Sequence, residues 1–248
     1  MAASWRRMVE AQTRMELRLT SRRLENLFVM LVIPPVLLAF FGAVPVLSTG
    51  AARPIDFLLP GVLALAVIST AFVNLSIATG FERGYGVLKR LGGSPLPRSA
   101  LIAAKLLTIA VVEAVQVILL VGIAAVLFGW RVPAGASLPL TIGAIALGTV
   151  TFAGLGLLLA GTLRAEATLA VANGLFLLLL LLGGVVLPLD HLPGLLETFA
   201  RLLPAAALSE LIRGSLTMPA LDLAGPFVVL VAWGAAGIVL TLRTFRWD

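Results

Sequence analysis

The sequence predicts an all-α integral membrane protein with six spanning helices and both chain ends in the cytoplasm. Of its 248 residues, 60% are hydrophobic and 12% are charged, whereas an average soluble domain carries about 25% charged residues. The apolar residues gather in runs that match the roughly 20 residues of helix needed to cross a bilayer. We therefore treat the whole chain, residues 1–248, as a single transmembrane domain.

Six apolar runs are long enough to cross the membrane, and each is a predicted span. They cover residues 27–47, 58–79, 101–128, 138–162, 168–187 and 223–242. With both ends in the cytoplasm, the external loops keep only four of the 18 lysines and arginines, namely Arg53, Arg131, Arg201 and Arg213. The positive-inside rule favours this orientation. The net charge of +6 then reflects membrane topology rather than binding to nucleic acid.

Residues 1–26 have a helical pattern unlike that of the spans. Trp5, Met8, Met15 and Leu19 recur at helical spacing with arginines between them. This pattern predicts an amphipathic helix at the cytoplasmic interface, with its arginines facing anionic lipid headgroups. The alternative is a basic tail that only sets the topology.

Residues 188–222 form a predicted external segment that four prolines interrupt. It is too broken to cross the membrane but still rather apolar. We predict two short re-entrant helices here, Leu195–Leu203 and Leu208–Leu216, which dip into the outer leaflet where protein satisfies their backbone.

The sequence lacks the motifs of several enzyme classes. A P-loop needs Gly-Lys-Ser/Thr, but Lys89 is followed by Arg90, and Lys105, the other lysine, by Leu106. An intramembrane serine protease needs a histidine near its serine, and the single histidine, His191, falls in the external segment. There is no cysteine and no HExxH motif. We therefore predict no catalytic residue and no metal site.

Residues 80–99, between the second and third predicted spans, combine charge with helical order. The pattern predicts a short amphipathic helix from Glu82 to Leu91, which Gly92 and Gly93 end in a left-handed cap. The two prolines that follow keep the chain extended before the next span. The alternative is an ordinary basic loop, but the ordered pattern favours a docking element at the membrane surface.

This loop resembles the signature of ABC-2 type transporter permeases. The resemblance rests on Glu82-Arg83, Gly86, Leu88, Leu91, Ser94-Pro95-Leu96 and, at the start of the next span, Lys105. Six spans and a proline-punctuated segment before the last span are similar as well. The resemblance implies the membrane subunit of an ATP-driven exporter in the plasma (inner) membrane, without ATPase motifs of its own.

In that family two permeases pair, and two separate ATPase subunits dock beneath them. The resemblance therefore implies ABC ATPase subunits as partners, which bind ATP and magnesium, together with a second permease copy or a sister permease, and membrane lipids. No cofactor is expected on this chain itself. Residues 1–26 become the connecting helix. The coupling helix, and with it contact to the ATPase, is assigned to Glu82, Arg83, Tyr85, Leu88, Lys89 and Leu91.

Polar side chains inside the predicted spans are a further group of candidates. Glu113 and Gln116 lie three residues apart in the third span, so they share a helix face. A carboxylate at mid-bilayer costs roughly 2.5 to 3.5 kcal/mol on insertion scales, so it should face protein or water. We expect this pair to join helices or to line a polar path, with Glu113 protonated or hydrogen-bonded through Gln116.

The resemblance also implies a substrate path, because it places the second and fifth spans along the cavity between the two permeases. The candidates for contact with substrate are Phe72, Asn74, Asn173 and Phe176. A mostly apolar lining favours a lipophilic or amphipathic cargo, such as a drug, an antibiotic or a lipid-like molecule. A different class stays open: an ATP-independent secondary carrier or channel would use Glu113 as a proton or ion site.

Overall fold

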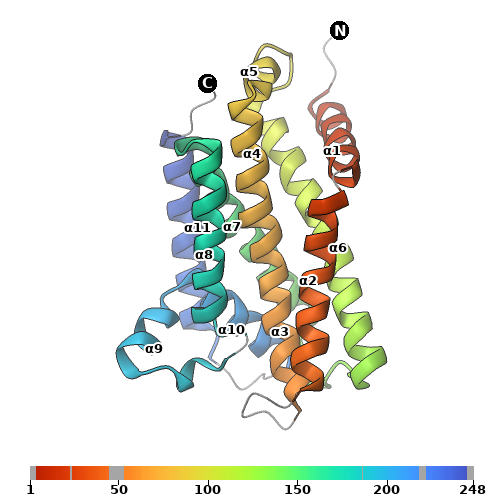
Figure 1. Cartoon of the computed structure of the whole chain (residues 1–248), viewed down its shortest axis with the longest axis vertical. Helices are drawn as coiled ribbons and strands as arrows, with labels where there is room; N and C mark the ends of the chain where they lie inside the picture. Colours follow the sequence, from red (N-terminus) through yellow and green to blue (C-terminus); the bar gives the residue numbers. More distant parts are fainter. Residues whose placement is uncertain (1–3, 23, 45–52, 186, 218–221, 245–248) are drawn as a thin grey trace.

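The computed structural model describes residues 4–22, 24–44, 53–185, 187–217 and 222–244. Every regular element within these ranges is a helix (Figure 1), which confirms the predicted all-α class. Parts of predicted elements, namely residues 1–3, 23, 45–47, 186 and 218–221, lie outside the described residues.

Within the described ranges, five helical segments are long and apolar enough to cross a membrane. They are Pro54–Gly84, formed by α3 (Pro54–Val67), the π-helix η1 (Ile68–Asn74) and α4 (Leu75–Gly84), then α6 (Arg98–Phe128), α7 (Leu138–Thr162), α8 (Ala165–Leu182) and α11 (Ala224–Thr244). The chain is thus a multi-pass membrane protein.

The helix α2 (Leu24–Ala43) decides the number of spans. It has 20 residues and carries two prolines, Pro34 and Pro35, inside its length. Its apolar stretch, Met30–Ala43, is shorter than the five segments above. It packs along α3 and α6. The count of six spans stays a prediction that depends on this helix.

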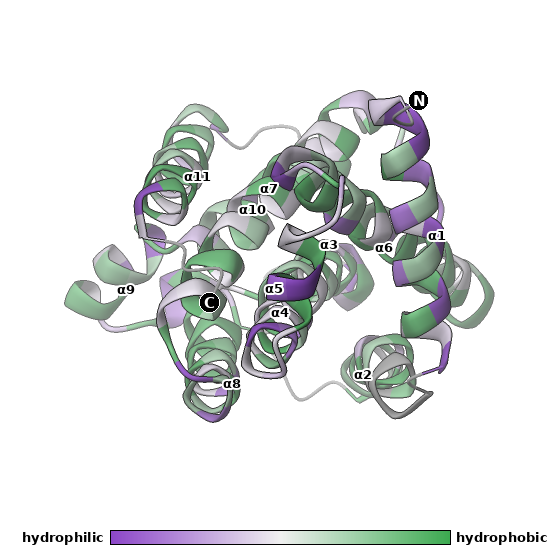
Figure 2. Cartoon of the chain, turned by 90° about the horizontal axis from the view of Figure 1, so that it is seen from above, coloured by the Kyte–Doolittle hydropathy of each residue, from purple (hydrophilic) through white to green (hydrophobic). Residues whose placement is uncertain are grey.

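The segment formed by α3, η1 and α4 is the centre of the bundle. Seen from above (Figure 2), it lies between α2, α6, α7 and α8, and it contacts all four helices. The π-helical turn lies where Gly156 of α7 approaches it: a Cβ on Gly156 would be 3.0 Å from the carbonyl oxygen of Phe72. Small residues allow such close helix contacts inside membranes.

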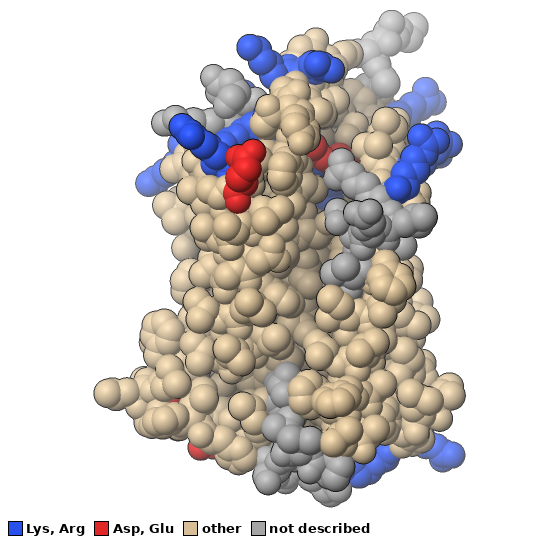
Figure 3. Space-filling model, viewed as in Figure 1, with Lys and Arg blue, Asp and Glu red and all other residues tan. Residues whose placement is uncertain are grey.

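The two ends of the bundle differ in charge. The helices α1 (Trp5–Arg22) and α5 (Val87–Gly92) lie at one end, whereas η2 (Leu189–His191), α9 (Gly194–Arg201) and α10 (Pro204–Leu216) lie at the other (Figure 1). On the face shown in Figure 3, lysines and arginines gather mainly at the first end, and uncharged residues form the middle. We call the first end the α5 end.

The helix α1 has the predicted amphipathic character. Val9 is buried against Ala100 and Ala104 of α6, while Trp5 and Met15 stay about half exposed, at 48% and 50%. Figure 2 shows hydrophilic residues along α1 at the edge of an otherwise mostly hydrophobic bundle. Its placement at a membrane interface stays a prediction.

The predicted continuous helix from Glu82 to Leu91 is wrong. The helix α4 ends at Gly84, a turn at Tyr85 and Gly86 follows, and α5 begins at Val87. The reason is Gly86, whose φ of 70° is left-handed, a conformation that glycine adopts without the usual Cβ penalty. The predicted left-handed cap is therefore not at Gly92 or Gly93, since the φ of Gly93 is −83°.

The opposite end is held by a buried arginine. Arg213 of α10 donates from Nη2 to the carbonyl oxygen of Gly184, 2.8 Å away, and its guanidinium lies 3.8 Å from the ring centroid of Phe57. Burial lowers the pKa of Arg213 to about 10, so it remains a cation at neutral pH. Pro204 begins α10 rather than interrupting a helix, as prolines at the first helical position do.

Candidate functional site

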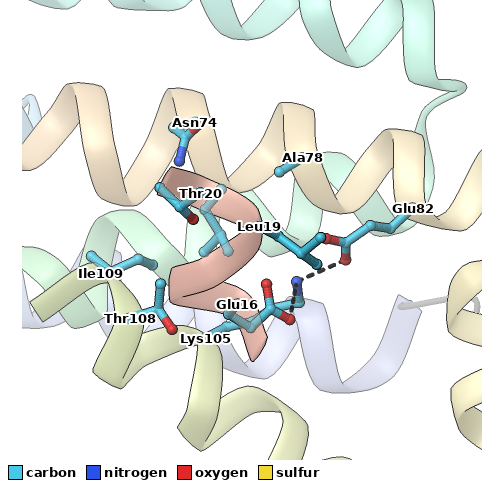
Figure 4. Close-up of a pocket in the computed structure, with 10 residues that line it drawn as sticks. Glu16, Leu19, Thr20, Asn74, Ala78, Glu82, Lys105, Thr108 and Ile109 are labelled. Carbon is cyan, nitrogen blue, oxygen red and sulfur yellow. Dashed lines mark hydrogen bonds and ion pairs between the residues drawn. The ribbon is translucent and has the colours of Figure 1, made fainter. Parts of the chain in front are cut away.

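The candidate site lies at the α5 end, where the last turn of α4 is tied to its neighbours. Lys105, from the second turn of α6, lies between two carboxylates (Figure 4). Its Nζ is 2.7 Å from Glu82 of α4 and 3.3 Å from Glu16 of α1. The three side chains are nearly buried, with exposures of 6% for Lys105, 13% for Glu82 and 12% for Glu16. We call these three residues the lysine triad.

The lysine triad joins three helices through one cation. Two carboxylates leave it with a net negative charge, and moving three ions out of water costs several kcal/mol for each ion. Removing Lys105 therefore leaves two buried carboxylates without a cation, whereas removing one carboxylate leaves a neutral ion pair. Such an arrangement has one good geometry, so it fixes how α1, α4 and α6 lie relative to each other.

A small polar cavity adjoins the lysine triad. It has a volume of about 50 Å³, and its lining includes Thr20, Asn74 and Thr108 beside the triad (Figure 4). A cavity of this size with several polar partners has room for water. The space between α1, α4 and α6 is thus lined by both polar and apolar side chains at this depth.

Arg83 ties the same turn of α4 to the other side of the bundle. Its guanidinium donates hydrogen bonds to the carbonyl oxygens of Gly161 and Leu163. These carbonyls belong to the last turn of α7 and to the residue that follows it, where helix carbonyls lack helical partners and the helix dipole favours a cation. Consecutive residues of α4 therefore bind opposite sides: Glu82 binds α6, and Arg83 binds α7.

Beyond this turn, α5 presents a small surface of its own. Leu88 is 1% exposed and lines a cavity with residues of α6, α7 and α11, so it anchors α5 to the bundle. Tyr85 is 73% exposed, and Lys89 and Arg90 are exposed as well. Leu91 is half-buried. Of the six residues predicted for coupling, Glu82, Arg83 and Leu88 thus serve the fold of this end, whereas Tyr85 and Lys89 are open to a partner.

Comparison with known proteins identifies the class of protein that carries this arrangement. The family profile described as ABC-2 type transporter matches residues 8–217, which runs from α1 through α10 and includes the lysine triad and Arg83. This chain belongs to the ABC-2 type transporter family. A search of curated proteins gives no significant match. The family membership confirms the predicted resemblance and makes the chain a transport permease.

The residues predicted to line a substrate path do not converge within one copy of the permease. Phe72 is 3% exposed and packs edge-on against Phe152, with ring centroids 6.3 Å apart. Asn74 lines the polar cavity beside the lysine triad. Asn173 is exposed on α8, and Phe176 is half-buried there. Contact of these residues with substrate stays a prediction, and the position of Phe72 is that of a packing residue.

The two polar residues in the middle of α6 bind different helices. Gln116 is 1% exposed: it accepts a hydrogen bond from Thr70 of η1 at 3.0 Å and donates to the carbonyl oxygen of Met30 in α2 at 2.9 Å. Glu113 is 3% exposed and lies 2.6 Å from the hydroxyl of Thr149 in α7. The expected hydrogen bond between Glu113 and Gln116 is therefore replaced by two contacts between helices.

Sequence reasoning missed part of the site. Glu16 was only one charge of the N-terminal pattern, and Lys105 only one residue of the family signature, so nothing indicated that they pair. The carbonyls that Arg83 binds carry no signal in a sequence. Within the described part of the permease, no three histidine, aspartate or glutamate side chains are grouped as metal ligands would be.

Proposed function

We propose that this permease is the membrane subunit of an ATP-driven exporter that moves a lipophilic or amphipathic molecule across the plasma membrane. The observation that carries the proposal is the double attachment of the last turn of α4. Glu82 holds it to α6 and α1, and Arg83 holds it to the end of α7. A force applied to α5 therefore reaches several membrane helices at once.

The coupling step follows from these attachments. A separate ATPase, which binds ATP and magnesium, contacts the exposed residues Tyr85, Lys89 and Arg90 of α5 and the turn before it. Leu88 keeps α5 seated on the bundle, so α5 and α4 move together. When the ATPase closes around ATP, the turn carrying Glu82 and Arg83 shifts and carries its neighbouring helices into a second arrangement.

The arrangement at α8 favours pairing with a second permease, either another copy or a sister chain. This helix exposes apolar side chains over most of its surface, together with the amide of Asn173. That amide donates to the carbonyl oxygen of Leu169 in its own helix, 2.9 Å away. A polar amide is better placed against another helix or a polar cavity than against lipid. The surplus of basic residues at the α5 end supports a cytoplasmic position for this end.

The proposal is tested with variants that separate binding of the ATPase from ATP-dependent transport. The first variant reverses the charges on α5, Lys89→Glu with Arg90→Glu, and should lose binding to the partner ATPase. The second, Glu82→Gln, should keep ATPase binding but lose most ATP-dependent transport in proteoliposomes. Arg131→Glu, an exposed change at the opposite end, is the matched control and should alter neither.

Two results would contradict the proposal. If the charge-reversed α5 still binds the ATPase as tightly as the unchanged chain, α5 is not the docking element. If the purified permease alone transports cargo without ATPase or ATP, and Glu113→Gln abolishes that transport, the chain is instead a secondary carrier.

A further inference from the structure

An open apolar groove of about 530 Å³ lies between α6 and α7, away from the lysine triad. Alkyl side chains form most of its lining, and two of them, Ile118 and Ile142, are 73% and 67% exposed. Ala110, Ala114 and Ala146 leave room between these larger residues. The volume falls in the range of sites that hold small molecules, and the lining suits an alkyl chain.

One carboxyl group, that of Glu113, lines this apolar groove. The residue lies 15 positions after Arg98, which places it about 22 Å along a helix that is about 46 Å long. Glu113 is therefore near the middle of the membrane-spanning helix. Within the described residues, no lysine or arginine forms an ion pair with it.

The contacts of Thr149 are compatible with an un-ionised form of this carboxyl. Thr149 Oγ1 lies 2.6 Å from Glu113 Oε2 and 2.9 Å from the carbonyl oxygen of Ile145. A threonine hydroxyl has a single proton, so it can donate to only one of these oxygens. The hydroxyl can donate to Glu113 as a carboxylate, or it can donate to Ile145 while an un-ionised Glu113 donates to Thr149. The geometry thus fits the carboxylic acid.

The second oxygen of the same carboxyl has nothing to bind. Glu113 Oε1 is buried and has no hydrogen-bond partner among the described residues. Buried polar atoms are almost always paired, so an unpaired one in a native protein calls for an explanation. The oxygen itself is buried, but its residue lines the open groove, so a small rotation of the side chain would bring the oxygen to a ligand there.

We propose that the groove between α6 and α7 binds a lipophilic amine that arrives from the bilayer. The amine crosses hydrocarbon as its neutral free base, with its alkyl chain between α6 and α7. At Glu113 the carboxyl O–H bond breaks and a new N–H bond forms, which leaves a carboxylate paired with an ammonium. The unpaired Oε1 then accepts a hydrogen bond from the ammonium, and Thr149 turns its own proton to the carboxylate. The site needs neither ATP nor the ATPase.

The test uses dicyclohexylcarbodiimide, an apolar reagent that modifies carboxylic acids but not carboxylates. The full chain in phosphatidylcholine nanodiscs is treated with the reagent, and modified residues are mapped by peptide mass spectrometry. We expect modification of Glu113, and none of Glu16 or Glu82, which lie outside the groove in ion pairs with Lys105. Dodecylamine should slow the modification of Glu113 about tenfold, as an ion pair worth roughly 1.4 kcal/mol would do. Dodecanol, with the same chain length, should not.

Two further variants separate the groove from a general effect on folding. Ala146→Trp fills the groove and should abolish both modification and protection, whereas Ala235→Trp, an exposed alanine on α11, should leave both unchanged. Native mass spectrometry should show dodecylamine bound to the unchanged chain and to Glu10→Gln, but not to Glu113→Gln. Failure to modify Glu113, or equal protection by dodecylamine and dodecanol, would overturn the proposal. Neither result would bear on coupling to an ATPase.

Discussion

Replacing Lys105 with methionine should destabilise the permease, because it leaves Glu16 and Glu82 facing each other without a cation. At an effective dielectric constant of about 20, Lys105 attracts Glu82 at 2.7 Å by about 6 kcal/mol and Glu16 at 3.3 Å by about 5 kcal/mol. Desolvation of the three ions offsets most of this gain. Removing one partner of a buried ion pair, however, costs about 3 to 5 kcal/mol, because the remaining charge stays uncompensated.

The assay is thermal unfolding of the purified chain in detergent. For domains of this size 1 kcal/mol shifts the midpoint by roughly 2–4 °C, so Lys105→Met should lower it by roughly 6–20 °C. The chain offers a matched control in Lys89, its only other lysine. Lys89 is exposed, so Lys89→Met should change stability by less than about 0.5 kcal/mol.

A neutral version of the lysine triad separates charge from packing. Glu16→Gln and Glu82→Gln, added to Lys105→Met, remove all three charges, and a buried ion cluster replaced by neutral groups is often no less stable. The midpoint temperature of the triple variant should therefore be close to that of the unchanged chain. If Lys105→Met has the same unfolding midpoint as Lys89→Met, the charge of Lys105 does not stabilise the fold. The same conclusion holds if the triple variant has a midpoint no higher than that of Lys105→Met.

Three further perturbations test other parts of the structure. Gly61→Ala should cost about 1–3 kcal/mol, because its Cβ would clash with the carbonyl oxygen of Val185; Gly143→Ala, which faces open space, is the control in the same melting assay. Arg83→Lys keeps the charge but cannot reach two carbonyls with one rigid fork, so it should cost about 1–3 kcal/mol and weaken ATP-dependent transport. Burial raises the pKa of Glu210 above its ordinary value of 4.5, so the folded state holds this proton more tightly than the unfolded chain. Stability should then fall as the pH rises from 4.5 through the folded-state pKa, and a comparison of melting across that range should show a smaller fall for Glu210→Gln.

Much of the helical architecture could be predicted because hydrocarbon allows few alternatives. A backbone that crosses a bilayer must satisfy its own hydrogen bonds, so a long apolar run can only be a helix. For this reason α7 occupies the same residues, 138–162, that the apolar run indicated. The break before α5 was missed for a local reason. Two adjacent glycines correctly indicated the helix end at residues 92–93, but the left-handed residue is the single glycine at Gly86, between α4 and α5.

The contacts of the candidate site could not be predicted, because they join residues far apart in the chain. Lys105 and Glu82 are 23 positions apart, and Glu113 and Thr149 are 36 apart. A helical pattern indicates which residues of one helix share a face, but not which neighbour that face meets. The sequence therefore offered Gln116, its neighbour on the same helix, as one possible hydrogen-bond partner of Glu113, besides a protonated carboxyl. In the folded chain Gln116 is instead hydrogen-bonded to Thr70 of η1 and to Met30 of α2.

Under the proposed coupling role of α5, the order of Glu82 and Arg83 explains how so short a helix could act on a whole bundle. Adjacent residues of a helix point in different directions, so an acid followed by a base must find partners on different sides. The acid meets Lys105 on α6, and the base meets the carbonyls at the end of α7. Exchanging the two residues would bring a second cation to Lys105 and a carboxylate to the negative end of a helix dipole, and both contacts would become repulsive. The double exchange, Glu82→Arg with Arg83→Glu, keeps composition and net charge unchanged. It should nevertheless destabilise the chain more than either neutral substitution, and a double exchange that melts and transports like the unchanged chain would show that the two attachments do not hold α4.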